Sequence, residues 1–185
     1  GTSSVRRSAQ LRAIFPGATF SPIRGNVETR LRKLDAGDCD ALVLAAAGLK
    51  RLGLDERVSA YLPIDLCVPA PGQGIVAVEI TGNAAQTVKD LVAGISDADA
   101  ATALVAERAV MQALGGGCQM PLGAIAGIDG PTLEVRGLVA SLDGRTMVRA
   151  TVRGHRGGAA AAGEKLAHKL LALGAAALLD GARNA

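Results

Sequence analysis

Two segments near the start of the chain place apolar residues at the spacing of a helix. The first follows a cluster of hydroxyl side chains and ends at Pro16 and Gly17, and its apolar positions are Val5, Ala9, Leu11 and Ile14. The second begins after Asn26, which can cap a helix, and ends at Gly37; its apolar positions are Val27, Leu31 and Leu34. The spacing therefore predicts two short amphipathic helices.

Three short apolar runs alternate with these helices, at residues 18–23, 40–46 and 75–80. The middle run reads DALVLAA and is typical of a strand buried on both faces of a parallel sheet. Between it and the third run, residues 61–74 contain three prolines and two glycines, which indicates a connector or hinge. The first half of the chain is therefore predicted to form an α/β lobe.

The second half changes from helical spacing to alternation. Helices are expected at residues 84–93 and 97–114, and the three glycines at 115–117 must end the second of them. Two Asp-Gly pairs, typical of tight hairpin turns, then separate alternating runs. These runs cover residues 123–128, 132–140 and 146–153. With a covering helix over 159–173, the pattern predicts a small α+β domain from near Ser96, with a three-stranded antiparallel sheet covered by helices.

Charge and aromatic content argue against one broad class of function. The formal net charge is only +3, and ten basic against six acidic side chains fall within residues 1–57. The aromatic residues are limited to Phe15, Phe20 and Tyr61, too few to stack on the bases of a single strand. We therefore expect no nucleic-acid partner. The positive excess is concentrated near the start of the sequence.

Other features bear on compartment and partners. The uncharged stretch at residues 109–128 contains glycines and a proline that would break a lipid-facing helix, and the polar start does not have the form of a signal peptide. Cys39, Cys67 and Cys118 form no CxxC pair, so neither a disulfide framework nor a metal site is expected. We expect a cytoplasmic protein with reduced thiols and no membrane partner. We also expect a monomer, because no exposed apolar stripe in the sequence indicates a partner subunit.

Basic and hydroxyl side chains near the first helix favour a bound anion. They place guanidinium groups, hydroxyls and free backbone N–H groups at one helix start, with further arginines in the next turn and helix. The residues are Ser3, Ser4, Arg6, Arg7, Arg24 and Arg30. Arginine forks bind carboxylate or phosphate in a bidentate manner, and composition does not distinguish the two. The alternative is that these arginines are solvated helix faces.

Cys118 follows three glycines in a predicted loop, where a thiol can serve as a nucleophile or a point of covalent attachment, or pack as a small hydrophobe. A thiol hydrolase needs a histidine and an acid, and both His155 and His168 are interpreted as surface residues. The segments GGGC and PGQG do not have the spacing of nucleotide-binding loops. The residues by themselves therefore indicate an anion site and a loop thiol.

Five ordered motifs carry a resemblance to a known family. They are GTSSVRRSAQL, IRGNVETRLRKLD, LAAAGLKRLGL, PAPGQG and AERAVMQALGGGCQMPLG. Together they span residues 1–123 and closely resemble the porphobilinogen deaminase family, also called hydroxymethylbilane synthase; the remainder resembles it in architecture. The resemblance implies a transferase of haem and tetrapyrrole biosynthesis. It joins four porphobilinogen molecules head to tail, releasing ammonia at each step, into the linear tetrapyrrole hydroxymethylbilane.

The resemblance also implies a cofactor and its binding residues. Cys118 carries a dipyrromethane through a thioether, as the primer on which the polypyrrole chain grows. Carboxylates of cofactor and substrate are bound by arginines, with hydrogen bonds from hydroxyls and a hinge contact from one glutamine. The implied binding residues are Thr2, Ser3, Ser4, Arg6, Arg7, Arg24, Arg30, Arg51 and Gln73. Two positions depart from the family pattern: many relatives have Arg and Glu where this chain has Ala113 and Gly115.

The implied domain organisation has three parts. Residues 1–68 form most of domain two, an α/β lobe of the periplasmic-binding-protein-like type; residues 69–95 form the hinge and the return segment of domain one; residues 96–185 form the C-terminal α+β domain. The family's catalytic Asp lies in an N-terminal domain with which nothing here aligns. We therefore expect no catalytic residue in this chain, and no activity from the chain alone.

Two other classes of function remain open from the residues. A noncatalytic carboxylate- or anion-binding module would bind its ligand reversibly and keep a free thiol at Cys118, and Arg24→Ala would weaken its affinity. A protein that binds the phosphate backbone of DNA or RNA would show a steep dependence on salt, but the net charge of only +3 and the low aromatic content argue against this class.

Overall fold

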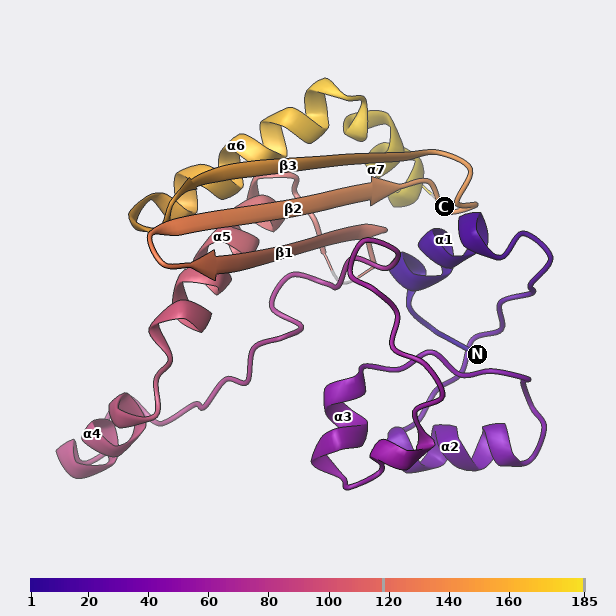
Figure 1. The fold of residues 1–185 in the computed structure, drawn as a ribbon, viewed down its shortest axis with the longest axis horizontal. Coiled ribbons are helices and arrows are strands. Elements are labelled where there is room, and N and C mark those ends of the chain that lie inside the picture. Colours follow the sequence, from indigo (N-terminus) through magenta and orange to yellow (C-terminus); the bar gives the residue numbers. More distant parts are fainter. Residues whose placement is uncertain (118, 185) are drawn as a thin grey trace.

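The C-terminal half is built on a three-stranded antiparallel sheet in the order β1-β2-β3 (Figure 1). The computed structural model describes residues 1–117 and 119–184. The strands are β1 (Leu122–Asp129), β2 (Thr132–Ala140) and β3 (Met147–His155). The Asp-Gly turns place Gly130 and Gly144 at φ +54° and +74°, the left-handed region that favours glycine. The predicted antiparallel meander is confirmed.

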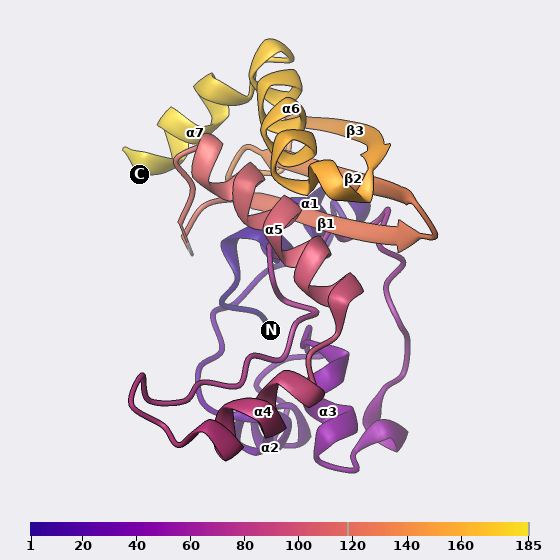
Figure 2. The same ribbon diagram turned by 90° about the vertical axis from the view of Figure 1, so that its left-hand side faces the viewer.

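Three helices pack on one face of this sheet: α5 (Ala98–Ala113), α6 (Ala159–Ala172) and α7 (Ala175–Arg183) (Figures 1 and 2). The short turn η2 (Arg156–Gly158) leads from β3 into α6. Gly174, at φ +98°, separates α6 from α7. The predicted small α+β domain is therefore confirmed, although the sequence pattern did not predict α7.

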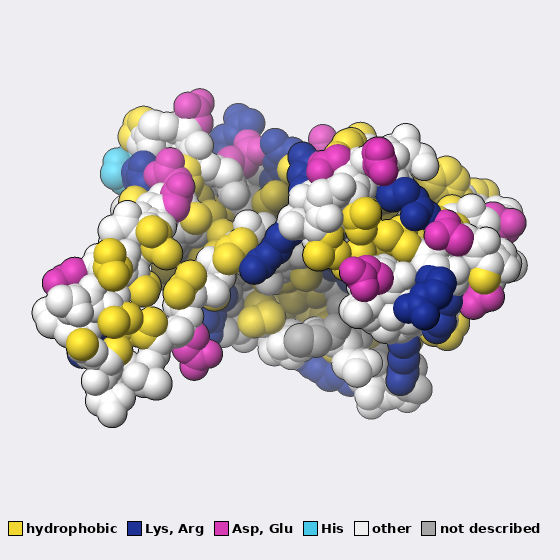
Figure 3. Space-filling model, turned by 90° about the horizontal axis from the view of Figure 1, so that it is seen from below, with side chains coloured by type: hydrophobic (Ala, Val, Ile, Leu, Met, Phe, Trp, Pro, Cys, Tyr) yellow, Lys and Arg dark blue, Asp and Glu magenta, His cyan; other side chains and the backbone are white. Residues whose placement is uncertain are grey.

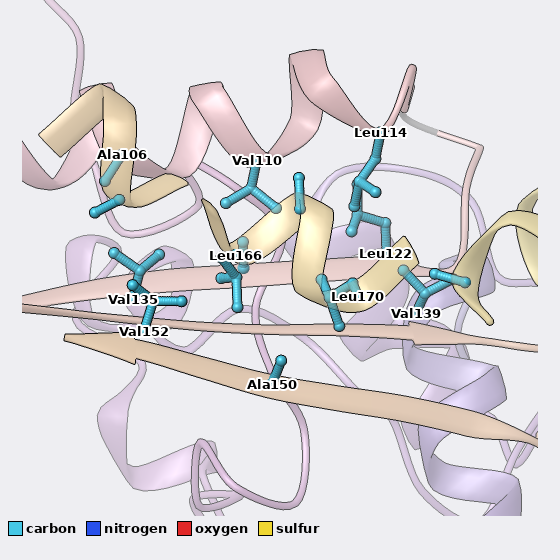
Figure 4. Packing of buried hydrophobic residues seen from close by; sticks show 14 of the residues in the cluster. Ala106, Val110, Leu114, Leu122, Val135, Val139, Ala150, Val152, Leu166 and Leu170 are labelled. Atoms are coloured by element: carbon cyan, nitrogen blue, oxygen red, sulfur yellow. The ribbon is translucent and has the colours of Figure 1, made fainter. Parts of the chain in front are cut away.

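The main core lies between the sheet and these helices. Alternate residues of β2, among them Val135 and Val139, are fully buried and meet Leu166 and Leu170 of α6 (Figure 4). Helices α5 and α6 approach closely at Gly163, where an added Cβ would lie 2.3 Å from the carbonyl oxygen of Ala106. The close approach requires glycine at this position.

The opposite face of the sheet carries a smaller cluster that joins the two halves of the chain. It comprises Ala9, Val68, Leu138 and Ala140. Ala9 belongs to α1 (Val5–Ile14). The turn after β2 lies directly on this helix, since a Cβ at Gly144 would meet the carbonyl oxygen of Ala9 at 2.3 Å. Arg12 Nη1 also donates to the carbonyl of Leu142 at 2.8 Å. The first helix is thus fixed to the C-terminal sheet.

The first half consists of short helices joined by extended segments. After α1 come α2 (Val27–Asp35), α3 (Ala46–Arg51), the turn η1 (Asp55–Arg57) and α4 (Gln86–Gly94). Both helix starts are capped. Ser4 Oγ, from the hydroxyl cluster at which the first helix is expected to start, accepts from the N–H of Arg7 at 3.3 Å. Asn26 Oδ1, the predicted cap of the second helix, accepts from the N–H of Thr29 at 2.8 Å. These bonds satisfy donors that a helix start leaves free. The two predicted N-terminal helices are confirmed, and the helix expected at 84–93 is found as α4.

The predicted α/β lobe of the periplasmic-binding type is wrong for this chain. Within the described residues, the segments 18–23, 40–46 and 75–80 contain no strand. Two of them make a few backbone bonds to the chain start. Thr2 N donates to Ser21 O and Val43 N to Gly1 O, both at 3.0 Å, and Gly1 N donates to Ala41 O at 2.7 Å. A strand requires a ladder of such bonds to a neighbour, which an apolar run cannot supply by itself. The run at 40–46 instead leads into α3.

The segment from residue 75 to residue 95 projects from the rest of the molecule with its apolar side chains exposed (Figures 1 and 3). The most exposed of them are Val76, Val78, Leu91 and Ile95. In a single domain such side chains would be expected to find cover. Among the described residues, no helix is both long and apolar enough to cross a bilayer.

Candidate functional site

The start of α1 holds a buried arginine between two parts of the chain. Arg6 is only 6% exposed, and its guanidinium donates through Nη1 to the carbonyl of Val68 and through Nη2 to Oε1 of Gln73 at 2.9 Å. Gln10, also buried, accepts from Val68 N at 2.8 Å. These bonds fix α1 against the residues that open the hinge segment.

Three arginines gather around this helix start. Burial lowers the pKa of Arg6 and of Arg7, because desolvation penalises the charged form; Arg7 also lowers the pKa of Arg6, and Arg30 lowers that of Arg7. Cys67 has the opposite effect and raises the pKa of both Arg6 and Arg7. Among the described residues, no ion pair involves any of the three arginines. The cluster is therefore a positive site that no carboxylate side chain of residues 1–117 or 119–184 neutralises through an ion pair.

The predicted hydroxyl ligands shape the turn that precedes α1. Thr2 is buried, and its Oγ1 accepts from the N–H of Ser4 at 3.2 Å. Ser4 Oγ accepts from the N–H of Arg7, as described above. Both hydroxyls keep their own O–H to donate to an anion. Ser3 Oγ already donates to the carbonyl of Ile23 at 2.7 Å, so it offers an acceptor only.

The other predicted arginines lie on neighbouring elements. Arg30 Nε donates to the carbonyl of Gly25 at 2.8 Å, which orients the guanidinium at the start of α2. Arg24 is exposed in the turn before α2, and Arg51 is exposed in the last turn of α3. The structure thus brings Arg6, Arg7 and Arg30 together and leaves Arg24 and Arg51 exposed on the surface.

A buried carboxylate, Glu107, joins the C-terminal domain to the hinge. It is only 5% exposed, and its oxygens accept from the N–H of Gly72 at 2.6 Å and of Ala126 at 2.8 Å. Burial raises the pKa of Glu107, and the two backbone N–H groups oppose this shift. Sequence reasoning missed this residue. The signal was an acid on a largely apolar helical face, next to Ala103, Ala106 and Val110.

A pocket of about 230 Å³ lies where the three parts of the chain meet. Ala45–Ala47 of the first half, the hinge residues Gln73 and Gly74, and Glu107 and Ile125 of the C-terminal domain contribute to its walls. Gln73 faces both this pocket and Arg6. The predicted hinge contact of Gln73 therefore lies beside the arginine cluster.

The predicted attachment residue, Cys118, lies outside the described residues. The loop that leads to it is described as far as Gly117, and Leu114 and Leu122 on either side are buried in the main core. Cys39 and Cys67 are free thiols, each partly buried. Within the described residues, no group of three or more His, Cys, Asp or Glu side chains is arranged to hold a metal ion.

Comparison with known proteins identifies two family models along the chain. Residues 1–89 match the dipyromethane cofactor binding domain of porphobilinogen deaminase, and residues 101–172 match its C-terminal domain. The arginine cluster and Gln73 fall in the first match, and Glu107 and Cys118 in the second.

Individual relatives agree with these models. Porphobilinogen deaminase of Bordetella parapertussis is 51% identical over 97% of this chain and 57% of the relative. The enzymes of Roseiflexus sp. and Acidithiobacillus ferrooxidans are 48% and 45% identical over 98% and 100% of the chain, and over 59% and 60% of the relatives. The chain thus spans somewhat less than two thirds of the length of these relatives. It belongs to the porphobilinogen deaminase family.

Proposed function

We propose that the chain contributes to an enzyme that polymerises four porphobilinogen molecules into hydroxymethylbilane, with release of ammonia, on a covalently held dipyrromethane. The observation that carries this proposal is the cluster of Arg6, Arg7 and Arg30, which has no carboxylate partner among the described residues. Each pyrrole of the substrate carries an acetate and a propionate. A site for a growing chain of such units needs cations that the protein has not already neutralised.

The donor set fits a dipyrromethane with its carboxylates. Desolvated guanidinium groups pair strongly with carboxylates, and the planar fork matches both oxygens. Thr2 and Ser4 retain hydroxyl donors beside the cluster. When bound, the dipyrromethane supplies the primer on which the pyrrole chain grows.

The residues take distinct roles in this proposal. Arg6, held by Gln73, and its neighbours Arg7 and Arg30 bind carboxylates of the cofactor, and Thr2 and Ser4 donate to the same anions. Ser3 shapes the turn and accepts hydrogen bonds, and the exposed Arg24 and Arg51 bind carboxylates of units added later. Cys118 carries the cofactor through a thioether. The positive charge keeps carboxylates bound as they accumulate.

The domain boundaries are part of the proposal. Residues 1–68 form the anion-binding portion, residues 69–95 the hinge with a segment of another domain, and residues 96–185 the C-terminal domain that carries Cys118. The exposed apolar side chains at 76, 78, 91 and 95 support the second assignment, since they need cover from elsewhere. The chain by itself is inactive in this account, because the family's catalytic Asp has no counterpart here.

The compartment and the oligomeric state are also part of the proposal. Free thiols at Cys39 and Cys67 support a reducing compartment, and we assign the cytoplasm. A monomer with porphobilinogen and the growing polypyrrole chain as its binding partners is the simplest assembly. Light scattering of the purified protein tests the oligomeric state.

Calorimetric titration of the whole protein with porphobilinogen tests the binding residues. Loss of a charged hydrogen-bond donor costs about 1.5–3 kcal/mol, so Arg7→Gln and Arg30→Gln are expected to weaken binding by about tenfold or more. Arg32→Gln is the matched control, because Arg32 lies exposed on the same helix as Arg30. Equal affinities for all three variants would contradict the proposal. Weaker binding without any covalent adduct would favour a noncatalytic carboxylate-binding module instead.

A further inference from the structure

The last helix reaches back to the end of α5 through one side chain. Arg183 Nη2 donates to the carbonyls of Leu114 and Gly115 at 3.2 and 3.1 Å. Its Nη1 donates to Oδ1 of Asp180, one turn earlier on α7, at 2.9 Å. Asp180 on the same helix therefore orients the guanidinium, which binds carbonyls at the end of α5 nearly 70 positions earlier in the sequence.

The carbonyls that Arg183 binds lie at the C-cap of α5 and one residue beyond it. The last carbonyls of an α-helix have no intrahelical donor and carry the negative end of the helix dipole. Leu114 is the C-cap of α5, and Gly115 follows at φ +59°, in the left-handed region. A cation with two suitable donors stabilises this end and fixes the direction in which the chain leaves the helix.

After the end of α5 the chain continues through the three consecutive glycines at 115–117, whose backbone has more conformational freedom than that of other residue types. Fixing the backbone of a residue costs roughly 1–2 kcal/mol, and glycine loses the most freedom. The N–H of Gly115 donates to Gln112 O and that of Gly116 to Met111 O, at 3.1 and 2.9 Å. Without the tether that Arg183 forms on the carbonyl side, these two bonds and the buried side chain of Leu114 would hold the start of the loop.

The guanidinium of Arg183 occupies the space that a side chain at position 115 would need. A Cβ at Gly115 would lie 2.9 Å from Arg183 Nη2, so a residue with a side chain would displace the guanidinium. The glycine at position 115 thus lets the guanidinium reach both carbonyls without a shift. This fit gives a physical reason for a glycine where the family resemblance leads one to expect glutamate.

We propose that Arg183 is a positioning residue for the loop that leads to Cys118. It holds the carbonyls of Leu114 and Gly115, and so fixes the point from which the chain runs to residue 118. The role of Cys118 as attachment point rests on the proposed function; the tether itself does not. Loss of Arg183 should leave the sheet intact while loosening the loop and slowing attachment of the cofactor.

Hydrogen exchange on the whole protein tests the tether. In Arg183→Ala, exchange of the Gly115 and Gly116 amides should rise about fivefold or more, with β2 and β3 unchanged, because two hydrogen bonds from a charged donor are lost. Arg183→Lys keeps the charge but lacks the fork, and should give an intermediate rate. Arg108→Ala is the control, since Arg108 is exposed on α5 itself. Equal rates in Arg183→Ala and Arg108→Ala would overturn the proposal.

A second readout separates positioning from general stability. Iodoacetamide alkylation of cofactor-free protein should accelerate at Cys118 in Arg183→Ala but not at Cys39 or Cys67, and the yield of cofactor adduct should fall. Faster alkylation of all three thiols would mean a purely structural role and would contradict the inference. If the wild-type protein forms no adduct at all, the proposed function fails, yet the exchange result still decides the tether.

Discussion

Replacement of Glu107 by glutamine tests whether the buried carboxylate joins the hinge to the C-terminal domain. The carboxylate accepts from two backbone N–H groups, of Gly72 and Ala126. Glutamine keeps one acceptor and places an NH₂ group against the other N–H. Because a hydrogen bond to a charged group contributes about 1.5–3 kcal/mol, we expect a loss of about 2 kcal/mol in the free energy of unfolding at pH 7.

The dependence on pH gives the sharper part of this prediction. Burial raises the folded-state pKa of Glu107 above the ordinary value of 4.5, so the folded protein takes up a proton at higher pH than the unfolded chain does. This group therefore adds stability as pH falls through its folded pKa, until the unfolded chain titrates as well. The stability difference between wild type and Glu107→Gln should widen as pH falls from 8 toward 5.

Urea denaturation of both proteins across this pH range measures the difference. Glu164→Gln is the control, because Glu164 is exposed on α6 and should shift neither the stability nor its pH dependence. At a loss of about 2 kcal/mol, the melting temperature should fall by about 4–8 °C. A difference that narrows as pH falls would refute the reasoning, since it would mean that the two N–H groups outweigh burial.

Three further changes test the packing and the surface charges. Gly163→Ala should lower the free energy of unfolding by about 1–3 kcal/mol in thermal melts, because its Cβ would lie 2.3 Å from Ala106 O. Gly181→Ala, in α7 with open space around it, should be neutral or slightly stabilising. Glu134, whose pKa is lowered by its hydrogen bonds to Arg153 and Arg136, contributes stability above its unfolded pKa that is lost as pH falls through the folded value. Glu134→Gln should therefore flatten acid denaturation curves slightly.

The local signals in the sequence predicted the C-terminal domain well. Asp-Gly pairs specify tight hairpins from two residues alone, and the helical spacing of residues 97–114 identified α5. The caps at Ser4 and Asn26 also follow from local chemistry. Such features depend on neighbours in the chain and can be predicted without knowledge of tertiary contacts.

The features that the sequence did not predict depend on distant partners. The run at 40–46 has the composition of a buried strand, but a strand also needs a neighbour to pair with, and composition does not supply one. Glu107 was not singled out from the sequence, because its burial depends on hinge residues 35 positions away. Helix α7 was missed because Gly174 was interpreted as the end of the covering helix, although the Ala- and Leu-rich residues 175–179 favour a helix locally.

For the candidate site, the sequence named the residues but did not predict the contacts between them. The resemblance named Arg6, Arg7 and Arg30, and the structure gathers them at the start of α1. That Arg6 would be buried and held by Gln73 could not be read from either segment alone, since 67 positions separate the two residues. The experiments proposed above test the role of each residue in binding.

The most direct test of the account is the mass of the peptide that contains Cys118 in the purified whole protein. The account predicts an intact mass excess equal to two linked pyrroles, located on that peptide and absent from the peptides with Cys39 and Cys67. The excess should disappear in Cys118→Ser. An unmodified Cys118 in a folded whole protein that has been supplied with porphobilinogen would contradict the account and leave a reversible carboxylate-binding protein in its place.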